Sequence, residues 1–239
     1  MLTELTERFP LLKGLLDFVY PPLCAGCGTY EENPDSICES CLRRIDWWDK
    51  SLVLTDVDLP PGDEDIGAPS ESIPLFAAGS YVDPLQRIIL QYKFHGAISV
   101  ASLIARKVAD RFGEPIRELG PTVLVPIPLH PSREYLRGYN QALIFADKLS
   151  EPLELPVDTN LLVRVKKRRP QSKLSKSKRA ANIKSVFALS PYFDPAEPRS
   201  QVILVDDVVT SGQTLFEARR TLRDAGITVA GAIAMAHKL

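Results

Sequence analysis

The sequence has 239 residues, of which 45% are hydrophobic and 25% charged, and its formal net charge is −1 at pH 7. This length suits one large domain, or an ordinary domain with a small appendage, and the charge gives no strong indication of partners. No apolar run reaches the roughly eighteen residues that a membrane span requires, and the charged residues among the first twenty do not form a secretory signal. We therefore expect a cytoplasmic protein that is not inserted in a membrane.

The N-terminal part of the chain is predicted to be an amphipathic helix followed by a metal module. Apolar residues recur at roughly helical spacing over residues 5–20, and all the cysteines of the chain follow as two pairs, Cys24 with Cys27 and Cys38 with Cys41. Without an export signal, disulfides explain this pattern poorly, whereas two Cys-x2-Cys pairs have the spacing of a four-cysteine zinc site. We expect Zn²⁺ in a structural role, because four thiolates leave no open coordination position; redox chemistry is the less favoured alternative.

Two features after the cysteines indicate how the chain is divided. Trp47 and Trp48 could form an exposed binding surface, but such a pair beside a small metal site more often packs in its core. Residues 55–74 combine acidic residues with prolines and glycines, a composition that is typical of a linker. We therefore predict an N-terminal module over residues 1–54, a linker over 55–74 and a main domain over 75–239.

The main domain is predicted to alternate strands and helices. A strand at 75–82 precedes helices at 84–94 and 98–112, and a buried strand at 122–127 precedes a helix that opens at 137–141. Further strands are expected at 161–165, 186–189, 202–205 and 228–235, the last of which closes the sheet. This alternation predicts an α/β fold with a parallel sheet.

Basic side chains follow the strand predicted at 122–127. His130, Arg133 and Arg137 are expected to converge at the strand end, the edge at which open α/β sheets bind ligands. Arginines there can bind an anion. The alternative is that the arginines pair with local carboxylates such as Glu134.

The most basic part of the chain lies between the strands expected at 161–165 and 186–189. It includes Lys173, and no acidic residue occurs between Asp158 and Asp194. A charge run is usually a solvated loop, but this one is suited to close on a polyanion such as pyrophosphate, or to hold nucleic-acid phosphates. The sequence leaves these two interpretations open, although the run contains few aromatic residues that could stack on bases.

The stretch from Val202 to Leu215 carries the clearest functional signal. Four apolar residues predict a buried strand, Asp206 and Asp207 follow at its end, and a helical pattern then begins. Carboxylates there suit two vicinal hydroxyls, and a turn at a helix N-terminus suits a phosphate monoester. The alternative is an ordinary strand-end turn with an N-cap. The residues expected around the phosphate are Thr210, Ser211, Gly212, Gln213 and Thr214.

This stretch resembles the phosphoribosyl-pyrophosphate (PRPP) loop of type I phosphoribosyltransferases, where Thr-Thr-Gly-x-Thr is usual and Ser211 keeps the hydroxyl. Further motifs span nearly the whole chain besides the cysteine pairs and this loop: Tyr92-Lys93-Phe94-His95-Gly96, Val125-Pro126-Ile127-Pro128-Leu129-His130-Pro131-Ser132-Arg133, Arg137-Gly138-Tyr139-Asn140-Gln141, and Gln171-x2-Leu174 with Arg179-x2-Asn182 and Phe187. With these motifs, the chain resembles the ComF family (the ComFC/GntX group) of phosphoribosyltransferase-like proteins. It departs from the family pattern at Arg168, where a threonine is often found.

The resemblance implies a type I phosphoribosyltransferase-like parallel sheet flanked by helices, with a small N-terminal zinc-ribbon-like module. It implies that Asp206 and Asp207 hold the ribose hydroxyls of PRPP, that residues 129–133 bind pyrophosphate, and that residues 166–179 form a flexible loop. Mg²⁺ would accompany PRPP. An active enzyme of nucleoside metabolism would displace pyrophosphate from C1 of PRPP, but no residues that select an acceptor base are recognisable.

The resemblance also implies a second function. Members of the family are associated with natural competence, in which they act on incoming single-stranded DNA in the cytoplasm, together with a competence helicase. The fold would then serve as a DNA-binding module without catalysis. A third alternative is a regulatory protein that senses PRPP or nucleotides without turnover.

Overall fold

The structure is a computed structural model that describes residues 21, 23–31, 37–56, 72–120, 122–165, 186–194 and 201–238. The side chains of His95 and Arg133 are outside this description. The helix predicted over 5–20, most of the acidic linker and the basic run from residue 166 also lie outside the described residues.

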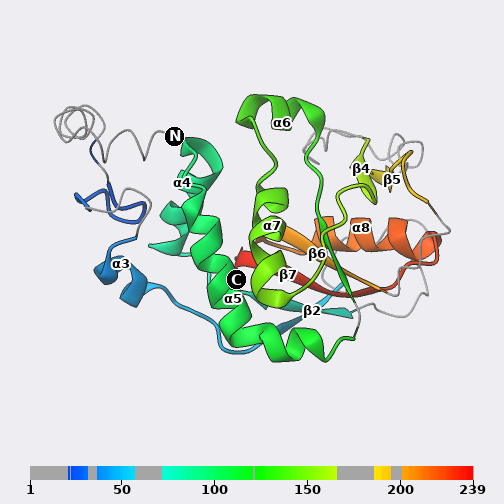
Figure 1. Cartoon of the computed structure of the whole chain (residues 1–239), viewed down its shortest axis with the longest axis horizontal. Coiled ribbons are helices and arrows are strands. Elements are labelled where there is room, and N and C mark those ends of the chain that lie inside the picture. Colours follow the sequence, from blue (N-terminus) through cyan, green and yellow to red (C-terminus); the bar gives the residue numbers. More distant parts are fainter. Residues whose placement is uncertain are drawn as a thin grey trace, which may run out of the picture.

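A five-stranded sheet forms the centre of the molecule (Figure 1). Its strands lie in the order β1-β2-β7-β6-β3, and all neighbours are parallel except β1 and β2, which pair antiparallel. The α/β fold with a mainly parallel sheet is therefore confirmed. The strands are β1 (Leu52–Thr55), β2 (Ser72–Ala77), β3 (Val123–Pro126), β6 (Val202–Val209) and β7 (Val229–His237).

Apolar side chains on the two faces of the sheet form two separate cores. Ile203 and Val205 of β6 contribute to one core, whereas Val202 and Leu204 contribute to the other, as expected when successive side chains of a strand point to opposite faces. The first core is covered by α4 (Leu85–His95), α5 (Ser99–Arg117) and α7 (Gln141–Leu153). The second is covered by α8 (Gln213–Asp224).

Two strands that the sequence placed in the alternating pattern lie outside the main sheet. β4 (Leu162–Arg164) and β5 (Phe187–Leu189) pair antiparallel with each other in a two-stranded sheet, which lies beside α8 (Figure 1). The two strands that flank the basic run are therefore not part of the main sheet, contrary to the prediction. Leu162 and Phe187 still reach the second core, which explains why these short segments are apolar.

The last two strands of the main sheet also differ from the prediction. β7 does not close the sheet at an edge, because it lies between β2 and β6. β6 extends to Val209, since β7 pairs with it as far as Val209 opposite His237. Asp206 and Asp207 are therefore inside the strand and not after it.

The cysteine module packs directly on the main domain. Cys24 and Cys41 are buried in the same core as Ile88 of α4 and Ile104 of α5. β1, which the predicted division gave to the N-terminal module and the linker, pairs with β2 in the main sheet. The boundaries at residues 54 and 74 stay a prediction, but the described parts on either side share one core.

Candidate functional site

Asp206 and Asp207 lie near the carboxyl end of β6 and are both partly buried. The Nζ atom of Lys93, in the last turn of α4, is 2.9 Å from Oδ1 of Asp207, and both side chains are less than 15% exposed. Asp207 Oδ1 also accepts a 2.6 Å hydrogen bond from the backbone N–H of Val208. Asp206 Oδ1 accepts a hydrogen bond from the N–H of Asp207 at 2.8 Å. The charge of Asp207 is thus neutralised by a lysine, whereas Asp206 is held by the backbone.

The two carboxyl groups differ in their electrostatic environment. Burial raises the pKa of Asp206 to about 7, and the neighbouring charge of Asp207 acts in the same direction. The hydrogen bond from Asp207 and the charges of Lys93 and Arg164 lower that pKa by smaller amounts. A carboxyl group that is about half protonated near pH 7 can both donate and accept hydrogen bonds, which suits a pair of sugar hydroxyls.

The loop after β6 leads into α8 in the way the sequence predicts. Gly212 has a left-handed conformation with φ +73° and is the N-cap of α8. Because glycine has no side chain, no side-chain hydrogen bond caps the helix, and the N–H groups of its first turn have no partner within the helix. Residues 208–215 and Asp206 line a small pocket at this helix N-terminus. Asp206 and the loop are therefore brought together in one site.

Three of the four predicted pyrophosphate residues, His130, Arg133 and Arg137, lie on or beside α6 (Pro131–Arg137), a short helix that the sequence analysis missed. Nδ1 of His130 caps α6 by accepting a hydrogen bond from the N–H of Ser132. Arg137, at the other end of α6, donates to Oε1 of Gln141 at 2.9 Å, and its guanidinium lies 5.1 Å from the ring centre of Phe94. The contacts of Arg137 are thus with α4 and α7. Lys173 and the side chain of Arg133 lie outside the described residues.

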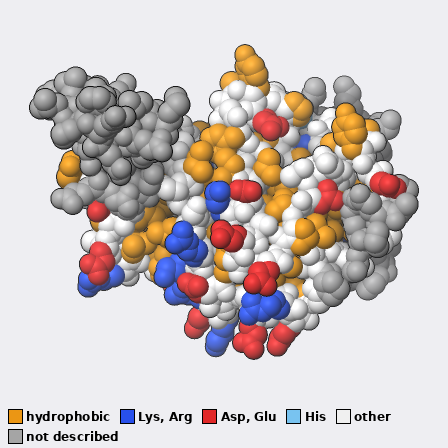
Figure 2. Space-filling model, viewed as in Figure 1, with side chains coloured by type: hydrophobic (Ala, Val, Ile, Leu, Met, Phe, Trp, Pro, Cys, Tyr) orange, Lys and Arg blue, Asp and Glu red, His pale blue; other side chains and the backbone are white. Residues whose placement is uncertain are grey.

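α6 stands out from the rest of the molecule (Figure 1). Tyr135 and Leu136 are 89% and 82% exposed, and hydrophobic side chains mark the tip of this helix in Figure 2. These two side chains contribute nothing to the cores, so α6 offers an apolar surface beside the predicted pyrophosphate loop.

Lys93 contacts the predicted site residue Asp207, and sequence reasoning did not single it out, although it lies in the Tyr92-Lys93-Phe94-His95-Gly96 motif. The structure shows how this motif is joined to the Arg137–Gln141 motif. The hydroxyl of Tyr92 donates to the carbonyl of Gln141 at 2.6 Å, and the hydroxyl of Tyr139 donates to the carbonyl of Tyr92. The available signal was that Lys93 lies at a helix end, in a motif that carries the family resemblance, but its partner Asp207 is over a hundred residues away.

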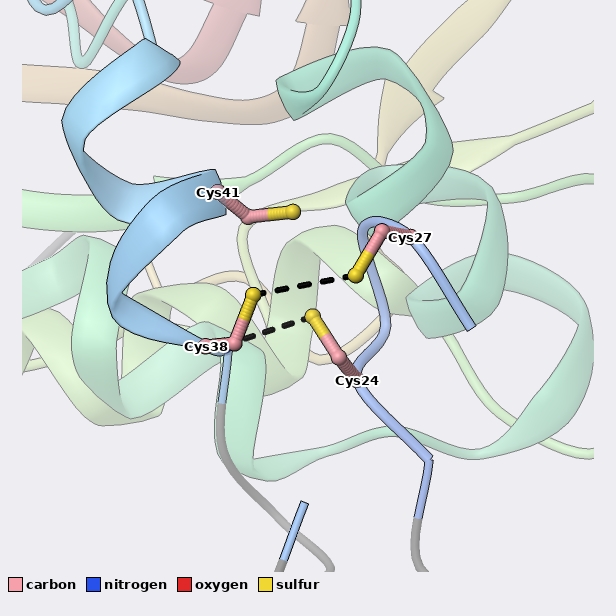
Figure 3. Close-up of side chains that lie close together, drawn as sticks. All are labelled: Cys24, Cys27, Cys38 and Cys41. Carbon is pink, nitrogen blue, oxygen red and sulfur yellow. Dashed lines mark hydrogen bonds between the residues drawn. The ribbon is translucent and has the colours of Figure 1, made fainter. Parts of the chain in front are cut away.

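The four cysteine sulfur atoms converge on one point (Figure 3), and all lie within 4.8 Å of one another. The Sγ atoms of Cys27 and Cys38 are 3.7 Å apart, close to the roughly 3.8 Å that tetrahedral Zn–S bonds of about 2.3 Å require. Sγ of Cys24 accepts hydrogen bonds from the N–H groups of Gly26 and Cys38. Cys38 and Cys41 come from the start of α3 (Glu39–Arg44), and the other two from the loop before it. The donor set and its spacing fit a structural zinc ion.

Trp47 and Trp48 follow α3 and are both partly buried. The indole N–H of Trp47 donates to the carbonyl of Leu42, and the guanidinium of Arg111 lies 5.8 Å from its ring centre. Trp48 packs against both cores of the main domain. Both side chains are partly buried, so they do not form an exposed surface, but Trp48 packs against the main domain and not, as predicted, within the core of the metal module alone.

The fold and the site together define a phosphoribosyltransferase-like protein with an N-terminal zinc module. Two family matches agree with this class: "Double zinc ribbon domain" matches residues 15–52 and "Phosphoribosyl transferase domain" matches residues 139–239. Since the chain has only four cysteines, the match to a double zinc ribbon corresponds to one four-cysteine site.

Similarity to individual curated proteins shows which family of phosphoribosyltransferase-like proteins the chain belongs to. Competence protein F of Haemophilus influenzae is 31% identical over 209 residues, which cover 86% of this chain and 80% of the relative. The DNA utilization protein YhgH of Escherichia coli K12 is 29% identical over 87% of this chain and 81% of the relative. Competence protein ComFC of Bacillus subtilis is 31% identical over 62% of this chain and 57% of the relative. The chain therefore belongs to the ComF family.

None of the helices in the described part of the chain is long and apolar enough to cross a membrane.

Proposed function

We propose that the protein binds the ribose 5-phosphate part of PRPP at the carboxyl end of β6. In this proposal the loop Thr210–Thr214 holds the 5′-phosphate, and Asp206 and Asp207 hold the ribose hydroxyls. The observation that carries the proposal is the placement of an uncapped helix N-terminus, opened by Gly212, next to two partly buried carboxyl groups. The N–H groups at the start of α8 can donate hydrogen bonds to the 5′-phosphate, and the carboxyl oxygens of Asp206 and Asp207 can accept hydrogen bonds from the ribose hydroxyls.

Lys93 has a defined part in this proposal. By pairing with Asp207 it prevents two adjacent negative charges from facing a negatively charged ligand. The raised pKa of Asp206 has the same effect, since the site then carries less than one uncompensated negative charge near pH 7. A sugar phosphate can enter such a site without strong repulsion.

If the protein is a transferase, the bond between C1 of PRPP and pyrophosphate breaks with its electron pair leaving on pyrophosphate, and a bond forms between C1 and the acceptor. Arg133, Arg137, His130 and Lys173 are proposed to neutralise the pyrophosphate. Carboxylate oxygens near the ribose fit Mg²⁺, which would stabilise the negative charge of the pyrophosphate when bound. The residues of the site do not indicate which base or other group would accept the phosphoribosyl unit.

Calorimetric titration of PRPP with Mg²⁺ into the full-length, zinc-loaded protein tests this proposal. Micromolar binding by the natural protein, lost in the double variant Asp206→Asn/Asp207→Asn, is the expected result. Binding would justify a screen of acceptor bases for pyrophosphate release. Absence of binding by the natural protein would refute the proposed ligand.

Single-stranded DNA is the second candidate ligand, favoured by the names of the relatives, which refer to competence and DNA utilization. The basic run of the sequence would bind backbone phosphates in the cytoplasm, and the exposed ring of Tyr135 could stack on a base. Anisotropy of a labelled oligonucleotide separates the candidates. A DNA-binding module should lose affinity steeply with added salt and should be unaffected by the Asp206→Asn/Asp207→Asn change.

A further inference from the structure

Arg137, at the end of α6, has a guanidinium group that is held by two neutral partners. Its Nη1 donates a 2.9 Å hydrogen bond to Oε1 of Gln141, and its Cζ lies 5.1 Å from the ring centre of Phe94. None of the ion pairs found among the described residues includes Arg137, so the alternative pairing with Glu134 is not observed. Within the described part of the chain, no carboxylate therefore neutralises the guanidinium, and its other N–H groups can donate to an anion.

The side chain of Gln141 is itself held by its surroundings. It is 1% exposed, and both ends of its amide are used. While Oε1 accepts from Arg137, Nε2 donates to the carbonyl of Tyr139 at 3.3 Å and to that of Lys93 at 3.5 Å. Its backbone carbonyl accepts the 2.6 Å hydrogen bond from the hydroxyl of Tyr92. A carboxylate in place of the amide would face two carbonyl oxygens without a proton to share, so these surroundings favour a neutral partner for Arg137.

The same contacts place Arg137 beside the ribose end of the proposed site. Lys93, whose carbonyl accepts from Gln141, pairs through its Nζ with Asp207, and Phe94 is the next residue of α4. The end of α4 thus contacts a proposed ribose residue with one side chain and a proposed pyrophosphate residue with the next. In PRPP the pyrophosphate is attached to C1 of the ribose, beside the 2′-hydroxyl. A cation at this place is therefore suited to the pyrophosphate, while the loop after β6 is proposed to hold the 5′-phosphate.

We propose that Gln141 and Phe94 are positioning residues for Arg137, which they orient for the pyrophosphate of PRPP without neutralising its charge. The inference rests on the proposed function. A carboxylate partner would also orient the guanidinium, but it would compete with the ligand for the same N–H groups and cancel the charge that attracts it. An amide oxygen and an aromatic face supply the orientation alone, so the cation is in place before the ligand binds.

Calorimetric titration of PRPP and of ribose 5-phosphate, each with Mg²⁺, into the full-length zinc-loaded protein and its Gln141→Glu variant tests the inference. Glutamate keeps an acceptor for Arg137 but adds a negative charge, so the affinity for PRPP should fall about tenfold or more, the usual effect of losing a hydrogen bond to a charged group. Ribose 5-phosphate has no pyrophosphate and should bind almost unchanged. Leu136→Glu is the matched control, because it adds the same charge to an 82% exposed side chain of α6, where solvent and salt screen it.

The two ligands separate the possible outcomes. Equal affinity of Gln141→Glu and the natural protein for PRPP overturns the inference and leaves the proposed function intact. An equal loss of affinity for both ligands also overturns it, since that marks a general structural defect, and so does an equal loss in the Leu136→Glu control. Failure of the natural protein to bind either ligand overturns the proposed function and the inference together.

Phe94→Leu tests the aromatic contact and stands even if the buried change at Gln141 prevents folding. Phe94 is 59% exposed, so its replacement removes little packing. Loss of the contact between the ring and the guanidinium should lower the affinity for PRPP about two- to fivefold and leave that for ribose 5-phosphate unchanged. Phe94→Tyr keeps an aromatic face and should restore the affinity. If Phe94→Leu binds PRPP as tightly as the natural protein does, Phe94 does not position Arg137.

Discussion

Among single residues, the two aspartates of β6 show how one strand can hold two carboxyl groups in different states. Asp207 has a lysine at 2.9 Å, whereas the groups nearest Asp206 are backbone and a second carboxylate. A charge that is buried without a close cation is costly, so Asp206 takes up a proton more readily. The contact with Lys93 therefore favours the negative charge on Asp207 over a negative charge on Asp206.

This difference predicts how stability depends on pH. The pKa of Asp206 in the folded protein, about 7, is higher than that of an unfolded aspartate, so between these values the folded protein binds more protons. Stability is therefore expected to fall as the pH rises from about 4 to about 7. Asp206→Asn removes the cost of the buried charge and should raise the free energy of unfolding by about 1–3 kcal/mol at pH 8.

Urea denaturation of the natural protein and of Asp206→Asn at pH 5 and pH 8 checks this prediction. At pH 5 the carboxyl group is neutral in the folded protein but still mostly ionised in the unfolded chain, so the gain should be clearly smaller than at pH 8 without vanishing. Asp207→Asn is the matched control, because it leaves Lys93 without its partner and should destabilise the protein at both pH values. A gain from Asp206→Asn that is the same at both pH values would contradict the assigned cause.

Among the helices and strands, those with a strong local pattern could be predicted from the sequence. The apolar faces of residues 85–95 and 99–117 are helical in spacing, and the run Val202–Val205 forms the buried part of β6. The loop after β6 could be identified because hydroxyls and a glycine precede a helix. Gly212 indeed has the positive φ that such a turn favours.

Elements that depend on distant partners could not be predicted in this way. The polar end of β6 is a strand only because β7 pairs with it, and β4 and β5 leave the main sheet because they pair with each other. The contact between Lys93 and Asp207 likewise joins two elements that are far apart in the sequence. A pattern within one segment carries no information about such pairing.

The glycines at the two ends of α8 allow a test of the loop. Gly212 and Gly226 have φ values of +73° and +78°, so alanine at either position should cost about 1 kcal/mol of stability. Only Gly212→Ala should also reduce the affinity for ribose 5-phosphate, by about tenfold or more, because relief of the strained positive φ would move the loop that is proposed to hold the phosphate. Calorimetry combined with thermal unfolding separates the two effects. Equal affinities of the two variants would place the phosphate elsewhere.

In the whole molecule, the cysteine module and the main domain share a core, and this arrangement predicts how they unfold. The buried side chains of Cys41 and Ile37 belong to the same cluster as Ile88 of α4 and Ile104 of α5. Loss of the metal should therefore not release a separate module. It should weaken the packing of α4 and α5 on the sheet, and α4 carries Lys93.

Scanning calorimetry of the zinc-loaded and chelator-treated protein tests this prediction. One transition is expected in both samples, lower by at least 10 °C without zinc, because metal binding to such a site contributes several kcal/mol to folding. Cys27→Ser and Cys41→Ser form a matched pair, since Cys27 is exposed and Cys41 is buried. If the metal is the main contribution, both variants should lose stability to a similar extent, and a chelator should lower neither one further. A small early transition followed by an unchanged main transition would instead show that the module unfolds independently of the main domain.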